Sequence, residues 1–239
     1  MENLTNEALE APRDFENFSA LNCIDLSSPD ILNSVSLLKQ ACLDSGFFYV
    51  INHGISQEFM DEVFYQSKSF FDLPVSEKMK VLRNKKHRGY TPLFNQSLDP
   101  GNQIHGDYKE GFVIGIEVPE NDPDIEKPLY GPNVWPPSDV LPGWRETMEK
   151  YHREALYGTW VSVFTCLILS RSTLHRVLGN GQERYSIAYF VEPNHDCLVE
   201  CLPTCQSQEN PPKFPPIKCE TYMLQRYKDT HAALESYAK

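Results

Sequence analysis

Residues 172–193 read STLHRVLGNGQERYSIAYFVEP, with two strand-like runs on either side of a glycine-rich turn. The first run covers residues 172–178, the turn is Gly179-Asn180-Gly181, and the second run covers residues 184–191. An asparagine-glycine pair between two such runs favours a β-hairpin, because both residues tolerate the positive φ that a tight turn requires. We therefore predict two paired strands in this segment.

Three side chains of the predicted hairpin can converge on one ligand. Arg184 and Ser186 are two residues apart, so they project from the same face of their strand, and His175 lies a short diagonal away on the partner strand. A guanidinium beside a hydroxyl binds a carboxylate through charge-assisted hydrogen bonds, and a neutral imidazole is a natural iron ligand. The same residues also fit a plain hairpin with a surface arginine and a core histidine, so the local pattern leaves both interpretations open.

The amino-terminal part of the chain is predicted to alternate short strands with helices. Residues 21–26 favour a strand, and Ser28 or Asp30 can cap a following helix that ends at Gly46. Residues 47–51 are aromatic and β-branched, which predicts a buried strand.

A second amino-terminal helix is predicted from the spacing of Phe59, Val63 and Phe70, with Pro74 as its stop. Ser76 can then cap another short helix.

The central part changes from loop to helix. Residues 88–137 are rich in glycine, proline and aspartate, with one strand candidate at 111–118. Residues 139–156 show helical spacing, which puts His152 on the exposed side of the predicted helix. The apolar face of this helix and its two expected ion pairs are formed by Trp144, Met148, Tyr151 and Ala155, and by Glu146 with Lys150 and Glu149 with Arg153. The pattern stops at Tyr157, and a final short helix is expected within residues 217–227.

Composition narrows the class of protein. A chain of 239 residues with 41% hydrophobic content favours one globular domain, and a net charge of -11 opposes binding to nucleic acid or to an anionic membrane surface. No apolar stretch reaches the roughly 20 residues of a membrane-spanning helix. The acidic amino terminus lacks the features of a targeting signal, and seven dispersed cysteines suit reduced thiols, so we expect a cytoplasmic protein. Cys197, Cys201 and Cys205 lack the close pairs of a zinc site.

Five segments in order resemble plant-type iron(II)- and 2-oxoglutarate-dependent oxygenases related to isopenicillin N synthase. They are DSGFFYVINHGI (44–55), FFDLPVSEKMK (70–80), RGYTP (88–92), DYKEGFVIG (107–115) and STLHRVLGNGQERYSIAYFVEP (172–193). The resemblance implies an α+β fold whose core is a double-stranded β-helix, or jelly roll, with flanking amino-terminal helices. It also implies iron(II) and 2-oxoglutarate as cofactors and a small organic molecule as the substrate that intact relatives hydroxylate or desaturate.

The family holds iron with a His-x-Asp pair and a distant second histidine. By resemblance, His175 matches the second histidine, while Arg184 and Ser186 match the Arg-x-Ser pair that holds the far carboxylate of 2-oxoglutarate. The family's His-x-Asp pair belongs to a block of strands between the long helix and this motif, and that block is missing here. Residues 157–170 stand in its place and match nothing in the family.

We therefore expect an internally truncated family member with an incomplete jelly roll, no catalytic residues and doubtful cofactor binding. Residues 1–156 form the amino-terminal oxygenase-like region, residues 157–170 a non-homologous junction, and residues 171–239 the remnant of the jelly-roll domain. Two alternatives remain: a non-catalytic binding protein or non-functional splice product, and an active enzyme that uses His105 and Asp107 with His175 as an unusual triad.

Overall fold

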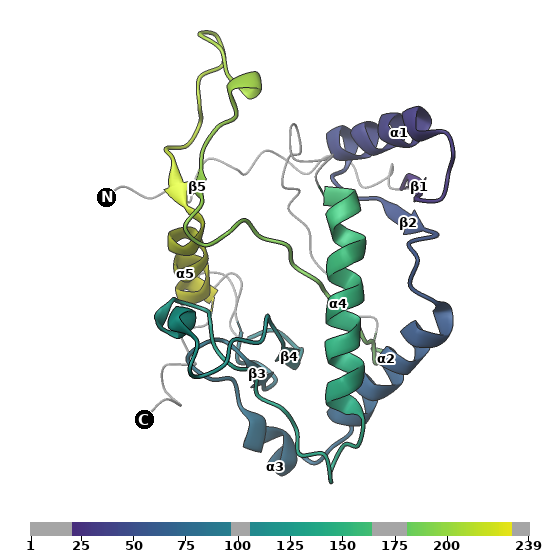
Figure 1. The fold of residues 1–239 in the computed structure, drawn as a ribbon, viewed down its shortest axis with the longest axis vertical. Coiled ribbons are helices and arrows are strands. Elements are labelled where there is room, and N and C mark those ends of the chain that lie inside the picture. The colour runs from purple at the N-terminus through teal and green to yellow at the C-terminus, as the bar shows by residue number, and fades with distance from the viewer. Residues whose placement is uncertain (1–20, 97–105, 164–180, 231–239) are drawn as a thin grey trace. The chain divides into compact units, whose positions relative to one another are not determined.

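The computed structural model describes residues 21–96, 106–163 and 181–230 (Figure 1). These residues divide into two compact units. One unit contains residues 21–54 and 161–163, and the other contains residues 55–96, 106–160 and 181–230. The described residues form helices and three separate two-stranded sheets. The expected mixture of helix and sheet is confirmed.

The first unit is built around a strand-helix-strand motif. Strands β1 (Cys23–Asp25) and β2 (Tyr49–Ile51) pair in parallel, and α1 (Ile31–Asp44) connects them. Asp30 caps α1 by accepting a hydrogen bond of 3.0 Å from the Asn33 amide, which confirms one of the two expected caps. A small core of Ile24, Leu38 and Cys42 holds the helix against β1.

The prediction that residues 47–51 form a buried strand was wrong about burial. Tyr49 and Ile51 in β2 are 64% and 46% exposed. A strand is buried on both faces only when other elements cover them, and within the described residues β2 pairs only with β1.

The second unit is organised by α2 (Gln57–Phe71) and by residues 144–160 of α4 (Trp144–Val163). Ser56 caps α2 by accepting a hydrogen bond of 3.3 Å from the Phe59 amide. The core around these helices also receives residues from the short α3 (Val75–Lys78), the 3₁₀ turn η2 (Met79–Val81) and the antiparallel pair β3 (Gly89–Thr91) and β4 (Gly111–Val113). Its buried members are Val63, Phe70, Val81, Tyr90, Leu141, Trp144 and Met148.

Three local predictions in this unit need correction. Ser76 lies inside α3, because that helix begins after Pro74 and has no side-chain cap. The strand at 111–118 is reduced to β4, and α4 continues beyond Tyr157 to Val163 although the amphipathic pattern ends there. A helix backbone needs only its own i to i−4 hydrogen bonds to continue, so the loss of a pattern does not end it.

The apolar face of α4 was predicted correctly, but its ion pairs were not. Trp144, Met148 and Ala155 are buried, and Tyr151 packs against the core. The ion pairs on α4 join Arg145 to Glu149 at 2.8 Å and Lys150 to Glu154 at 3.7 Å.

A buried ion pair connects α3 to the strand pair. The Lys78 ammonium lies 3.0 and 2.8 Å from the two carboxylate oxygens of Glu110 and also donates to the Phe71 carbonyl at 2.8 Å. The Tyr90 hydroxyl donates to the same carboxylate at 2.5 Å. Burial, and then this hydrogen bond, raise the pKa of Tyr90, so the phenol stays protonated.

The carboxy-terminal part ends in a small strand pair and a helix. Strands β5 (Leu198–Val199) and β6 (Ile217–Lys218) are antiparallel, and α5 (Cys219–Thr230) follows directly, close to where the last helix was predicted. On α5, the Tyr227 ring stacks on His87 with ring centroids 4.3 Å apart and lies under the Arg83 guanidinium at 5.3 Å. Two further 3₁₀ turns are η3 (Pro123–Glu126) and η4 (Pro203–Cys205).

The predicted hairpin at 172–191 is not seen as such. Its first arm lies outside the described residues, and its second arm, residues 184–191, has no strand assignment. A strand is defined by the ladder it shares with a partner, and no such ladder includes this arm in the described part of the chain. None of the described helices combines the length and apolar character needed to cross a membrane.

Candidate functional site

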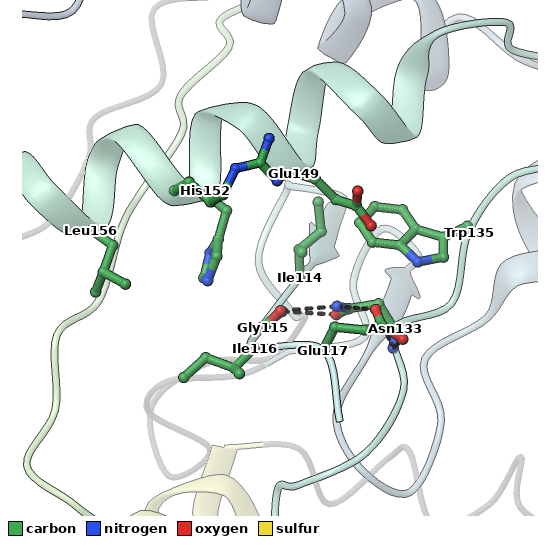
Figure 2. Close-up of a pocket in the computed structure, with 10 residues that line it drawn as sticks. Ile114, Gly115, Ile116, Glu117, Asn133, Trp135, Glu149, His152 and Leu156 are labelled. Carbon is green, nitrogen blue, oxygen red and sulfur yellow. Dashed lines mark hydrogen bonds between the residues drawn. The ribbon is translucent and has the colours of Figure 1, made fainter. Parts of the chain in front are cut away.

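A cavity of about 400 Å³ lies between α4 and the chain that continues from β4 (Figure 2). One wall comes from α4, another from residues 114–117, and a third from residues 133 and 135. The lining residues are Ile114, Gly115, Ile116, Glu117, Asn133, Trp135, Glu149, His152, Arg153 and Leu156.

Asn133 holds the two non-helical walls together. Its side-chain amide accepts a hydrogen bond from the Gly115 amide and donates to the Gly115 carbonyl, both at 2.9 Å (Figure 2). The same amide donates to a Glu117 carboxylate oxygen at 2.7 Å, and that carboxylate also accepts from the Asn133 backbone at 3.3 Å. These bonds fix residues 115–117 beside the loop and give the cavity a defined wall.

His152 faces this cavity, so the prediction that it lies on the exposed side of its helix was wrong. Figure 2 shows its ring pointing from α4 toward Gly115 and Ile116. It is half-buried, and burial, together with the charges of Arg88 and Arg153, lowers its pKa from the ordinary value of 6.5. The imidazole is therefore neutral at neutral pH and can accept or donate a hydrogen bond.

Apolar atoms form most of the cavity surface, which comes mainly from Ile114, Ile116, Trp135 and Leu156. Polar and charged residues also line it, namely Glu117, Asn133, Glu149, His152 and Arg153, and Figure 2 shows the neutral His152 ring pointing toward Gly115 and Ile116. Small-molecule sites commonly have this composition and a volume of about 300–1,000 Å³. The arrangement can hold a small, largely apolar molecule, and it was missed from sequence because Asn133 and Trp135 lie in a loop without a motif.

The cavity does not contain a His-x-acid pair of metal ligands. His152-Arg153-Glu154 has the spacing of such a pair, but residues two apart on a helix point about 200° apart. His152 faces the cavity, while Glu154 forms an ion pair with Lys150. The two side chains cannot bind one metal ion.

Arg184 and Ser186 lie on one face of an extended segment, as predicted. Exposure alternates along it: Arg184 and Ser186 are exposed, while Tyr185, Ile187 and Tyr189 are half-buried. The half-buried side chains meet the core of the second unit, with ring centroids 6.3 Å apart for Tyr185 and Phe71 and 5.4 Å apart for Tyr189 and His152.

The outer face of the segment is open to a ligand. Within the described ranges, neither Arg184 nor Ser186 has a hydrogen-bond or ion-pair partner. A guanidinium and a hydroxyl side by side on one face fit a carboxylate.

The residues expected at an iron site are only partly described. His175 and His105 lie outside the described residues. Asp107 is described; its backbone pairs with residues 94 and 96, and its carboxylate lies 3.4 Å from the Lys109 ammonium. In the part of the chain that the structure describes, no three His, Cys, Asp or Glu side chains gather as a metal site, including around Cys197, Cys201 and Cys205. The described residues by themselves therefore provide no iron site.

Comparison with known proteins defines the class. The family described as non-haem dioxygenase in morphine synthesis, N-terminal, matches residues 21–138. Azadirone synthase from Melia azedarach is 38% identical, in a match that covers 89% of this chain and 93% of the relative. Kihadalactone A synthase from Citrus sinensis is 34% identical, with 89% and 92% covered. A 2-oxoglutarate-dependent dioxygenase from Monascus ruber is 38% identical, over 52% of this chain and 38% of the relative. The chain belongs to the iron(II)- and 2-oxoglutarate-dependent oxygenase family.

Solved structures agree on the fold. A full-length protein from Neurospora crassa, crystallised in complex with alpha-KG, aligns with a TM-score of 0.67 and 20% identity, covering 86% of this chain and 95% of that one. A 2OG-Fe(II) oxygenase family protein from Caulobacter crescentus aligns with a TM-score of 0.68 and 16% identity, covering 88% and 99%. At such low identity the likeness concerns the fold alone.

Proposed function

We propose that this chain is a non-catalytic member of the 2-oxoglutarate-dependent oxygenase family, with an incomplete jelly roll. The observation that carries the proposal is the absence of a His-x-Asp pair after the long helix: among seven histidines, only His105 is followed two residues later by an aspartate. His105 precedes α4 in the sequence, and in this family the segment before the long helix contributes to substrate binding and not to the metal site.

The length of the alignment supports a missing block. The match to azadirone synthase runs over 312 positions, more than the 239 residues of this chain, so parts of the relative have no counterpart here. A deletion between α4 and His175 would remove strands that cover the hairpin region. Phe190 and Val191 are 81% and 42% exposed, as expected for a segment without such neighbours.

The remaining groups can hold only part of the cofactor set. His175 alone would bind iron weakly, because useful affinity comes from several ligands placed in advance. Arg184 and Ser186 would hold one carboxylate of 2-oxoglutarate, without the chelation that iron supplies at its other end. We expect weak cosubstrate binding and no turnover.

Metal content and cosubstrate binding test the proposal on the purified full chain. Anaerobic dialysis against iron(II) is expected to leave far less than one iron per chain. Calorimetry with 2-oxoglutarate is expected to show weak binding that falls in Arg184→Lys, which loses the planar fork, and is unchanged in Arg145→Lys. One tightly held iron per chain would refute the proposal, and iron lost together with succinate release in His105→Ala would establish the unusual triad instead.

The cavity beside α4 favours a second candidate function, binding of a small apolar molecule without catalysis. We propose it because apolar walls surround a neutral, half-buried imidazole in a space large enough for a ligand. Binding of the neutral dye N-phenylnaphthylamine is expected to fall several-fold in Ile116→Trp, which fills the cavity. Ile31→Trp, at a similarly exposed isoleucine of the first unit, should leave binding unchanged. Equal dye binding by both variants would rule out the cavity as a site.

A further inference from the structure

Strands β5 and β6 lie beside the start of α5 (Figure 1), and Cys197 and Cys219 are the residues that adjoin their paired ends. The ladder pairs Leu198 with Lys218 and Val199 with Ile217, so the next pair outward is Cys197 with Cys219. A backbone hydrogen bond of 3.0 Å from the Cys219 amide to the Cys197 carbonyl continues the ladder to this pair. Both cysteines carry free thiols in the structure.

Directly opposite residues of an antiparallel ladder have the spacing that a disulfide needs. Their Cα atoms lie about 4.5–5.5 Å apart and their side chains share one face. A disulfide joins Cα atoms that are roughly 4.4–6.8 Å apart. We propose that Cys197 and Cys219 form a reversible disulfide by exchange with a low-molecular-weight disulfide such as oxidised glutathione.

The two thiols differ in a way that sets the order of the exchange. Cys197 is exposed, whereas Cys219 is 6% exposed and its Sγ lies 3.5 Å from the Pro193 carbonyl. Burial, and then the charges of Glu192, Cys197 and Glu220, raise the pKa of Cys219. Cys197 therefore reacts first with a reagent in solution.

The exchange proceeds in two balanced steps. The Cys197 thiol loses its proton to water and attacks one sulfur of oxidised glutathione, whose sulfur-sulfur bond breaks and releases one glutathione thiolate. The Cys219 thiol then loses its proton and attacks the Cys197 sulfur, which releases the second glutathione. The two protein thiols are oxidised by two electrons, and the glutathione disulfide is reduced to two thiols.

The neighbouring cysteines are poorer partners for Cys219. Cys201 and Cys205 lie in the loop beyond β5, away from the ladder position opposite Cys219. A shared metal is also disfavoured, since no three potential ligands gather in the described ranges. The cross-link would enclose a loop of 21 residues, from Leu198 to Lys218. It would also join the first residue of α5 to the segment before β5.

Peptide mapping of the full chain tests the cross-link. After incubation with oxidised glutathione and alkylation of the remaining thiols, trypsin releases Tyr185–Lys213 and Cys219–Arg226. We expect these two peptides to be recovered mainly as one linked species that has lost two hydrogens and separates on reduction. Recovery of the two only as free or glutathione-bearing peptides would overturn the proposal.

Serine variants and a denatured control identify the partner. The linked species should persist in Cys201→Ser and Cys205→Ser and disappear in Cys197→Ser. Persistence in Cys197→Ser would overturn the pairing. When the wild-type chain is oxidised in urea, Cys219 should form disulfides with each of Cys197, Cys201 and Cys205, because the ladder is then absent. The same mixture in native buffer would show that the ladder does not direct the bond.

Discussion

Replacing Phe70 by alanine tests whether the second unit folds around one cooperative core. Phe70 is fully buried, and its ring centroid lies 4.8 Å from Phe112, 5.3 Å from Phe71, 5.5 Å from Trp144 and 5.9 Å from Tyr90. Removal of a buried phenylalanine costs about 3–5 kcal/mol, and more when its neighbours cannot collapse into the cavity. Large rings surround this site, so we expect a loss of about 4 kcal/mol, which corresponds to a fall in Tm of roughly 8–16 °C.

Urea denaturation followed by tryptophan fluorescence measures this loss, because Trp144 lies against the Phe70 ring. Phe190→Ala is the matched control: the same atoms are removed from a side chain that is 81% exposed, and we expect a change within about 0.5 kcal/mol. Equal effects of the two substitutions, or a loss below about 1 kcal/mol for Phe70→Ala, would refute the packing described here.

Three further outcomes follow from the described contacts. Ser56→Ala should cost about 1 kcal/mol in urea denaturation by removing the cap of α2, whereas Ser76→Ala, which removes no cap, should cost far less. Glu110→Gln should lower the free energy of unfolding by about 3 kcal/mol, because it leaves the Lys78 ammonium buried without its partner. This value is at the lower end for buried ion pairs because Glu110 is 23% exposed. The double variant Lys78→Met/Glu110→Gln should recover much of this loss. Because the pKa of His152 is lowered, the native state binds fewer protons than the unfolded state just below pH 6.5. The free energy of unfolding should therefore fall as the pH falls through that value. In urea denaturation at a series of pH values, His152→Gln should reduce this dependence on pH.

The helices could be predicted from sequence because their signals are local. The cap Asp30 and the apolar spacing of Val63 and Phe70 act within one or two turns, and the structure confirms them. The Ser56 cap of α2 is equally local, although it was not predicted. The alternation that places Arg184 and Ser186 on one face is equally local, since successive side chains of any extended segment point to opposite sides.

Burial depends on distant residues, and there sequence reasoning failed. The apolar run of β2 predicts a buried strand, but burial requires covering elements that the composition of the run does not specify. His152 follows Met148 by four residues and so lies beside the buried face of α4, a signal that its polar character obscured. The predicted partner of residues 184–191 is the arm at 172–178, which lies outside the described residues, so this pairing stays a prediction.

Turnover of 2-oxoglutarate by the purified 239-residue chain tests the central claim most directly. With iron(II), ascorbate and oxygen supplied, we predict succinate release no faster than in the same mixture without protein. Succinate formed in an iron-dependent manner by this chain would contradict the loss of catalysis.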